Sequence, residues 1–283
     1  MSIGLGYKPG ATSVPTGGGG GAGATPYTLT SITDIPSGAV DGEAGELNGR
    51  IYVLATLTKD ADAGGGTYQT WTDPAYTSHT VSAYLVGTEA DDAARTAVGM
   101  TTALTSTGTA TGNHSDSATR LEGSGSGAQP SAAELRPTSL VSSVPSGAVY
   151  IRAEVRAVVA TTGTDNFAGF TIFDGAAAGR TLGSKGNAFG CVGGGGLNRT
   201  LQSTGSLRSG GSILPTSGFD LIEICDDGRT ELARVYRNGE LYHSLRRNAT
   251  ITALNIVQIA SYNNGGTGVT FDLKNVLVTY EAP

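Results

Sequence analysis

The sequence predicts an all-β protein. Its C-terminal half is expected to be an antiparallel two-sheet sandwich, preceded by a smaller β unit and an extended glycine-rich N-terminal arm. Glycine supplies 44 of the 283 residues, about twice its ordinary usage, and a glycine inside a helix costs about 1 kcal/mol relative to alanine. The glycines do not recur at every third position, which excludes collagen. β-branched and aromatic segments, separated by turn residues, recur at the spacing of a sandwich.

Composition divides the chain into four predicted parts. Residues 1–26 are rich in Gly, Pro and Thr and contain the run Gly17–Gly21, so they bury too little apolar surface to fold alone. We predict that they form an attachment arm that becomes ordered against a partner; a disordered leader is the alternative. An N-terminal β domain (27–120), a Ser/Gly linker (121–138) and the β-sandwich (139–283) are expected to follow.

Two features leave this division open. The linker prediction depends on the flexible Ser/Gly chemistry of Gly123–Gly127, and a long surface loop inside one domain would have the same composition. The segment Pro36–Val40 recurs as Pro145–Val149, each time ahead of a predicted strand. A turn-to-strand pattern shared by unrelated halves explains this repeat, and two duplicated sandwiches are the alternative.

The N-terminal β domain is expected to contain two strands and one short helix. Arg50–Leu57 and Thr77–Val86 are rich in the β-branched and aromatic residues typical of strands. Thr88 followed by acidic residues resembles a capped helix start. It predicts a helix over about 89–98.

The C-terminal half has the clearest strand pattern. Its sharpest local signal is Asn238-Gly239, because this pair tolerates the positive φ that both central positions of a type I′ hairpin turn require. The predicted strands are Val149–Val159, Phe167–Phe173, Phe219–Cys225, Thr230–Tyr236, Leu241–Leu245, Asn255–Ser261 and Thr270–Tyr280.

Charge and hydropathy exclude several classes of partner. The net charge of −6 argues against a nucleic-acid-binding protein, which would carry a basic patch. No apolar run approaches the roughly 18 residues of a membrane span, so no membrane insertion is expected. The first residues show no signal-peptide pattern, which leads us to expect synthesis and folding in a cytoplasm.

The residue types that hold metals are scattered. Cys191 and Cys225 have no CxxC spacing, and His79, His114 and His243 are far apart in the sequence. We therefore predict no metal site. The two cysteines either pair in a disulfide or remain free thiols. The glycine-rich runs do not match phosphate-binding or dinucleotide-binding loops, so no cofactor is expected.

The carboxylates also favour a protein that is not an enzyme. Glycoside hydrolysis needs two carboxylates that face one sugar bond, and jelly-roll glycosidases carry E-x-D-x-x-E along one strand. Here Glu223 is followed by Cys225 where the second acid would stand, and Gly228 replaces the third. The simpler interpretation of Asp226–Gly228 is a turn.

Three C-terminal segments resemble concanavalin A-like sandwiches of the laminin G type. They are Val235–Leu241, Ile256–Gly266 and Val269–Val278, and they follow that family's order of hairpin, strand, glycine-rich turn and last strand. The resemblance implies a two-sheet antiparallel jelly roll of a kind that often binds glycans.

The whole chain also resembles tailed-bacteriophage virion proteins, such as head fibres, tail fibres and spikes, in its order of arm, Gly/Thr/Ser-rich body and lectin-like C-terminal module. This resemblance implies a structural subunit on the virion surface, as a fibre, spike or capsid decoration active in host attachment. The arm would bind other virion proteins, and the chain would form a homo-oligomer, expected to be a trimer. The sandwich would contact host surface polysaccharide. A free-standing carbohydrate-binding module and a polysaccharide depolymerase are the alternatives.

Two groups of residues are candidates for glycan binding, since aromatic platforms with amide and carboxylate hydrogen-bonding groups suit sugars. Trp71 is the single tryptophan; a core anchor is the alternative to a binding platform. For Tyr262, Asn263 and Asn264 the alternative is a turn. Tyr236, Tyr242 and Asp272 belong to the same group as Tyr262, and the second group joins Trp71 with Tyr68, Asp73 and Tyr76.

Overall fold

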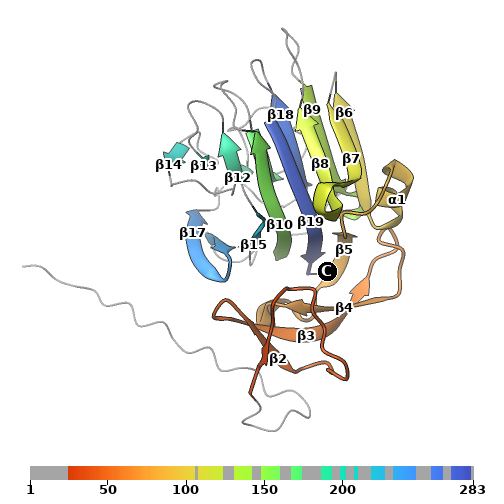
Figure 1. The fold of residues 1–283 in the computed structure, drawn as a ribbon, viewed down its shortest axis with the longest axis vertical. Helices are drawn as coiled ribbons and strands as arrows, with labels where there is room; N and C mark the ends of the chain where they lie inside the picture. The colour runs from red at the N-terminus through yellow and green to blue at the C-terminus, as the bar shows by residue number, and fades with distance from the viewer. Residues whose placement is uncertain are drawn as a thin grey trace, which may run out of the picture.

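In the structure, a computed structural model, most of the regular secondary structure of the described residues is β-strand, arranged in two sheets (Figure 1). The residues that the structure describes are 25–105, 108–123, 131–141, 148–159, 167–173, 186–192, 198–201, 207–209, 218–226, 232–246, 256–263 and 269–281.

The first sheet has twelve strands, and most neighbours are antiparallel. Only the β1–β2 and β3–β5 pairs are parallel among the described strands. In spatial order its path is β1 (Tyr27–Thr28), β2 (Ala44–Leu47), β3 (Arg50–Lys59), β5 (Thr80–Leu85), β19 (Val269–Tyr280), β10 (Val149–Val159), β15 (Asp220–Asp226), β16 (Leu232–Arg237) and β17 (Glu240–Arg246). Off this path, β4 (Thr67–Thr72) pairs with β3, and β7 (Thr109–His114) pairs with β8 (Ala118–Gly123), which pairs with β19.

The second sheet has seven strands. Their spatial order is β14 (Leu207–Ser209), β13 (Asn198–Leu201), β12 (Gly186–Val192), β11 (Phe167–Phe173), β18 (Ile256–Asn263), β9 (Ser131–Pro137) and β6 (Met100–Thr105). Within the described ranges, one α-helix and three short 3-10 helices connect the strands: α1 (Asp92–Ala97), η1 (Pro74–Tyr76), η2 (Ser115–Ser117) and η3 (Thr138–Val141). No helix among the described residues is long and apolar enough to cross a membrane.

The main core lies between the two sheets. Alternation along β10 sends Ile151, Ala153 and Val155 into this core, where they join Leu135 of β9 and Phe170 of β11. Because side chains in a strand alternate between faces, the intervening charged residues of β10 lie on the opposite face of the first sheet. That outer face carries the polar clusters described below.

The N-terminal strands cover part of this outer face. In Figure 1, β2, β3 and β4 lie at the lower ends of β10 and β19. Tyr52 of β3 and Trp71 of β4 are both fully buried, and they form an apolar cluster with Leu221 of β15. The first sheet therefore curls, so that strands far apart in its hydrogen-bonded order face each other.

The sheets do not follow the predicted division at residues 121–138. Strand β19 pairs with β8 along its first half and with β5 along its second half, so residues from 27–120 and 139–283 share one sheet. Residues 131–137, predicted to be part of a linker, form β9 between β18 and β6. Backbone hydrogen bonds to two neighbours hold a segment whose composition alone resembles a loop.

Local predictions agree more closely with the structure. The hairpin at Asn238-Gly239 is confirmed, with φ of 49° and 86° at the two turn residues. The helix predicted over 89–98 is shorter, spanning Asp92–Ala97, because the side chain of Asp91 rather than Thr88 caps it by accepting from the Ala94 amide. The all-β fold class is likewise confirmed.

Candidate functional site

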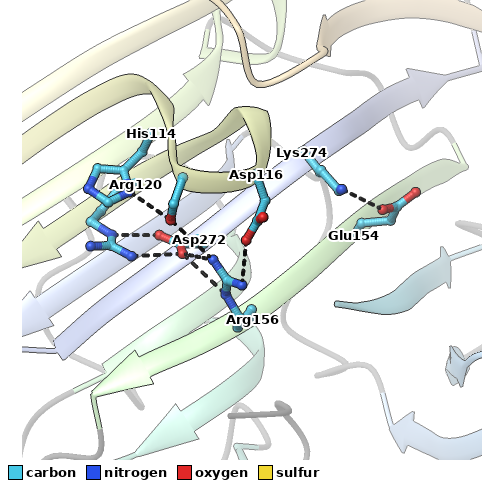
Figure 2. Close-up of polar contacts among 8 residues, drawn as sticks. His114, Asp116, Arg120, Glu154, Arg156, Asp272 and Lys274 are labelled. Atoms are coloured by element: carbon cyan, nitrogen blue, oxygen red, sulfur yellow. Dashed lines mark hydrogen bonds and ion pairs between the residues drawn. The ribbon is translucent and has the colours of Figure 1, made fainter. Parts of the chain in front are cut away.

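A row of three charged side chains crosses the outer face of the first sheet. Arg120 on β8 lies opposite Asp272 on β19, and Asp272 lies opposite Arg156 on β10. The three strands are neighbours, so the register alone places the carboxylate between the two guanidinium groups. We call these residues the Arg–Asp–Arg row (Figure 2).

Both arginines donate hydrogen bonds to the Asp272 carboxylate. Arg120 donates from Nε to Oδ1 at 2.7 Å and from Nη2 to Oδ2 at 2.9 Å. Arg156 donates from Nη2 to Oδ2 at 2.7 Å and from Nε to the same oxygen at 3.3 Å. Forked Arg–carboxylate contacts of this kind are shorter and more directional than neutral hydrogen bonds. The row is therefore a rigid, preorganised group.

Burial and charge act on Asp272 in opposite directions. Its side chain is fully buried, and this burial alone would raise the pKa of the carboxyl. The hydrogen bonds and charges of Arg120 and Arg156 outweigh burial, so the pKa of Asp272 is lowered from its ordinary value. Asp272 is thus a permanent acceptor at neutral pH, while the two arginines remain partly exposed.

The turn between β7 and β8 adds a second carboxylate. Asp116 accepts a hydrogen bond from Nη1 of Arg156 at 2.8 Å, and its side chain is 57% exposed. Figure 2 shows Asp116 pointing toward Arg156 from the short η2 helix. The His114 ring lies at the start of the same turn, where its Nδ1 is 3.1 Å from Oγ of Ser115.

A second charged pair and an aromatic ring border the row. Nζ of Lys274 lies 3.6 Å from Oε2 of Glu154, and Oε1 of Glu154 accepts from the side-chain Nδ2 of Asn275 at 2.9 Å. Cζ of Arg156 lies 4.5 Å and Nζ of Lys274 lies 4.4 Å from the centroid of the Phe219 ring. The surface thus combines fixed hydrogen-bonding groups with an aromatic ring that lies close to two cations.

The structure separates the residues that the sequence suggested for glycan binding. Asp272 belongs to the Arg–Asp–Arg row. Tyr236 lies beneath Arg50, whose Cζ is 3.5 Å from the ring centroid, and it packs against the cluster around Tyr150. Tyr242 packs instead against the core between the sheets. These three residues therefore do not form one surface.

Trp71 and the Tyr262 segment also lie apart from the row. Trp71 is fully buried, and its Nε1 donates to the backbone oxygen of Asp34. Its role as a binding platform is therefore wrong, and the core alternative is confirmed. Tyr262 and Asn263 end strand β18 of the second sheet, whereas Asn264 lies outside the described residues.

Sequence reasoning missed Arg120, Arg156 and Asp116. Arg156 and Asp272 are 116 residues apart in the chain, and only the strand register brings them together. One signal was present: Arg152, Glu154 and Arg156 alternate with apolar residues on β10, which indicates a strand with one charged face.

A second, covered cluster lies on the same outer face. The fully buried Glu223 carboxylate accepts from the hydroxyl of Tyr52 at 2.7 Å and from that of Tyr150 at 2.6 Å, and it lies 3.1 Å from Nε of Arg50. Burial raises the pKa of the neighbouring Cys225 thiol, which makes that group a poor nucleophile. This cluster joins the N-terminal strands to β10 and β15.

The described residues contain no group of three or more His, Cys, Asp or Glu side chains that could hold a metal ion. Cys225 is a free, buried thiol; Cys191 lies in β12, and its side chain lies outside the described part of the structure.

No protein-family model and no curated protein sequence matches the chain. Among solved structures it is similar to the marine PL7 alginate lyase AlyA1 from Zobellia galactanivorans, with 10% identity, a TM-score of 0.48, and coverage of 82% of this chain and 94% of that one. It is also similar to the family 7 alginate lyase A1-II′, with 14% identity, a TM-score of 0.47, and coverage of 71% and 96%.

A third similar structure is a conserved carbohydrate esterase from the Shiga toxin-encoding bacteriophage phi24B. Identity is 10% and the TM-score 0.46, and the match covers 72% of this chain and 100% of that one. Values this low describe a distant likeness in the arrangement of strands and say nothing of activity.

Proposed function

We propose that the chain is a surface subunit of a bacteriophage-like virion and that the outer face of its first sheet binds host surface carbohydrate. The observation that carries the binding proposal is the Arg–Asp–Arg row. Its carboxylate and guanidinium groups are held in place before any ligand arrives, and preorganised groups lose little freedom on binding. The nearby Phe219 ring adds an apolar surface.

The state of the carboxylate favours binding over cleavage. A general acid must carry a proton at the working pH, but the two arginines lower the pKa of Asp272 and engage both of its oxygens. Asp272 therefore suits the role of a fixed hydrogen-bond acceptor. This supports a chain that binds polysaccharide without hydrolysing it.

The virion proposal has a different basis. It is supported by the order of segments in the sequence, with residues 1–26 as the arm that binds other virion proteins and the sandwich turned outward. In this proposal the subunits associate as a homo-oligomer, expected to be a trimer, and act in host attachment after synthesis in the host cytoplasm. The chain needs no cofactor for this role.

Carbohydrate binding is tested with immobilised bacterial capsular polysaccharides and lipopolysaccharides. Arg120→Gln and Arg156→Gln should each weaken binding about tenfold, because loss of a charge-assisted hydrogen bond costs about 1.5 kcal/mol. Arg234→Gln is the matched control, since Arg234 is exposed on β16, away from the row. Equal binding by all four proteins would remove the row from the binding surface.

The virion role is tested by mass spectrometry of purified particles. The chain should be present at a fixed copy number, and a variant lacking residues 1–26 should fold but fail to incorporate. Polysaccharide binding by a chain that is absent from particles would favour the free-standing module. Release of reducing ends from the bound polysaccharide would favour the depolymerase.

A further inference from the structure

Arg156 holds two carboxylates that differ sharply in their surroundings. Its Nε and Nη2 atoms point at Asp272, which is fully buried, whereas Nη1 donates to Asp116, whose side chain is 57% exposed. The first contact is part of the sheet. The second joins the sheet to a turn, and only this second carboxylate is free to rotate into solvent.

The turn that carries Asp116 has an unusual backbone. Asn113, Asp116 and Ser117 have φ of 49°, 62° and 53°. Non-glycine residues seldom adopt positive φ, although Asn and Asp do so more readily than Ser. Such conformations persist where the surroundings enforce them, and they concentrate at ligand-binding sites. The conformation at Asp116 directs its carboxylate toward Arg156 (Figure 2).

Neighbouring backbone holds the turn in this conformation. The amide of Asn113 donates to the Gly87 carbonyl at 2.8 Å. A Cβ on Gly87 would lie 2.4 Å from the Ser117 carbonyl oxygen, so the loop at Gly87 fits tightly beneath the turn. The backbone therefore stays in place when the Asp116 side chain leaves Arg156, and displacement needs only a side-chain rotation.

The contact between Asp116 and Arg156 is also weak enough to be replaced. Exposed ion pairs contribute little, because water screens the charges and the side chain loses rotational freedom. A ligand group of the same charge would meet an Arg156 Nη1 donor that already points toward it, and Nζ of Lys274 lies close to the same Phe219 ring as Arg156. Arg presents a geometry that matches carboxylate and phosphate oxygens.

We infer that the Nη1 edge of Arg156 is an anion subsite, and that Asp116 occupies it as an internal stand-in until an anionic saccharide arrives. The ligand is a sugar that carries a carboxylate, sulfate or phosphate group. This inference rests on the proposed function, since it specifies which carbohydrates the row binds. In this inference Asp116 competes with the ligand for Arg156, whereas Asp272 is part of the surface that binds the ligand.

The test compares Asp116→Asn with the unaltered chain, because Asn tolerates the same positive φ and lacks the charge. Glucuronate, glucose 6-sulfate, glucose and inorganic sulfate are titrated at low ionic strength and followed by NMR chemical shifts. Asp116→Asn should bind the charged probes about two- to fivefold more tightly, the gain expected from removing one exposed ion-pair competitor. Glucose affinity should not change.

Two further variants complete the comparison. Asp92→Asn is the matched control, because Asp92 is also an exposed carboxylate paired with an arginine, Arg95, in an ion pair outside the row. It should leave every affinity unchanged. Arg156→Gln should remove the preference for charged probes. Circular dichroism checks that each variant is folded.

The outcomes separate this inference from the proposed function. Sugar binding that is identical in Asp116→Asn and the unaltered chain overturns the subsite and leaves carbohydrate binding in place. A gain for inorganic sulfate without binding of any sugar supports the subsite and overturns carbohydrate binding. Absence of binding by every probe to every variant overturns both.

Discussion

Two buried carboxylates on one face of the first sheet have different tasks. Asp272 accepts bonds from two partly exposed arginines. Glu223 is covered by Tyr52 and Tyr150, which donate to its two oxygens. The donors around Asp272 reach solvent, so this cluster is a candidate ligand surface. The donors around Glu223 are buried, so that cluster only connects the N-terminal strands to β10 and β15.

Glu223→Gln should lower the free energy of unfolding by about 1–3 kcal/mol, because Arg50 keeps only its Asp73 partner and one of the two tyrosine hydroxyls loses its acceptor. Chemical denaturation followed by fluorescence measures the change. Glu240→Gln is the control, since Glu240 is exposed at the start of β17. A change below about 1 kcal/mol for Glu223→Gln would mean that the buried cluster around Glu223 contributes little to the stability of the fold.

His79 makes the fold sensitive to acid. It is buried, and its Nδ1 lies 3.1 Å from the Thr279 hydroxyl. Burial lowers its pKa from 6.5 to about 4, although the nearby Glu281 carboxylate acts in the opposite direction. The unfolded chain therefore binds the proton first. The neutral ring stabilises the fold fully above pH 6.5, and this contribution is lost as the pH falls toward 4.

The pH dependence can be assigned to His79 by substitution. Between pH 7 and pH 4.5 the native chain should lose about 2–3 kcal/mol through this one group. His79→Asn keeps a hydrogen-bond donor for Thr279 but does not titrate there, so its stability should fall less over the same interval. Urea titrations at the two pH values measure the difference. An equal loss of unfolding free energy between the two pH values in both proteins would contradict this assignment.

At the scale of elements, two type I′ turns contact each other. Asn48-Gly49 joins β2 to β3 with φ of 54° and 82°, and Asn238-Gly239 joins β16 to β17. A Cβ on Gly239 would lie 3.0 Å from the Asn48 carbonyl oxygen, whereas nothing lies within 4 Å of the same position on Gly49. The two glycines share a conformation but not an environment.

Alanine substitutions separate the cost of a positive φ from the cost of the close contact between the two turns. Gly49→Ala should cost about 1 kcal/mol, because alanine is strained at positive φ. Gly239→Ala should cost about 2 kcal/mol or more, since the added methyl group must also push the turns apart. Thermal unfolding compares the two. A Gly239→Ala variant as stable as Gly49→Ala would show that the second turn moves away without cost.

Sequence patterns predicted the strands that are rich in strand-forming residues. Val149–Val159 and Phe167–Phe173 are rich in β-branched and aromatic residues, and β10 and β11 have these same bounds. Strands β6 and β9 were missed because they are rich in threonine, alanine and charged residues. Strand β9 pairs with β18, which lies far away in the sequence, and β6 pairs in turn with β9.

At the scale of the whole molecule, the candidate site could not be predicted from local patterns. Arg120, Asp272 and Arg156 come from three distant segments, and β19 has to close the sheet before they meet. Asp272 was predicted as a glycan-binding carboxylate because such groups accompany aromatic residues in sugar sites, and its two arginine neighbours were not part of that prediction. Its arginine partners follow from topology alone, since a one-residue shift in register would turn them into the core.

The same topology predicts how the chain unfolds. Removing residues 1–138 would take β5 and β8 from β19, and β9 from β18. It would also expose the apolar surface that Tyr52 and Trp71 cover. The remaining strands would have new open edges, and open edges favour aggregation over folding.

A fragment of residues 139–283 should therefore show no cooperative unfolding transition, while residues 25–283 should unfold in a single step. Calorimetry and hydrogen exchange compare the two, and the longer fragment is the control because it retains every strand of both sheets. The most protected amides should lie in β10 and β19, which pair along most of their length in the middle of the first sheet. If 139–283 unfolds cooperatively by itself, the C-terminal part is an independent domain and the N-terminal strands are an addition to it. Their hydrogen bonds to β19 would then be dispensable for folding, and residues 121–138 would mark a true boundary.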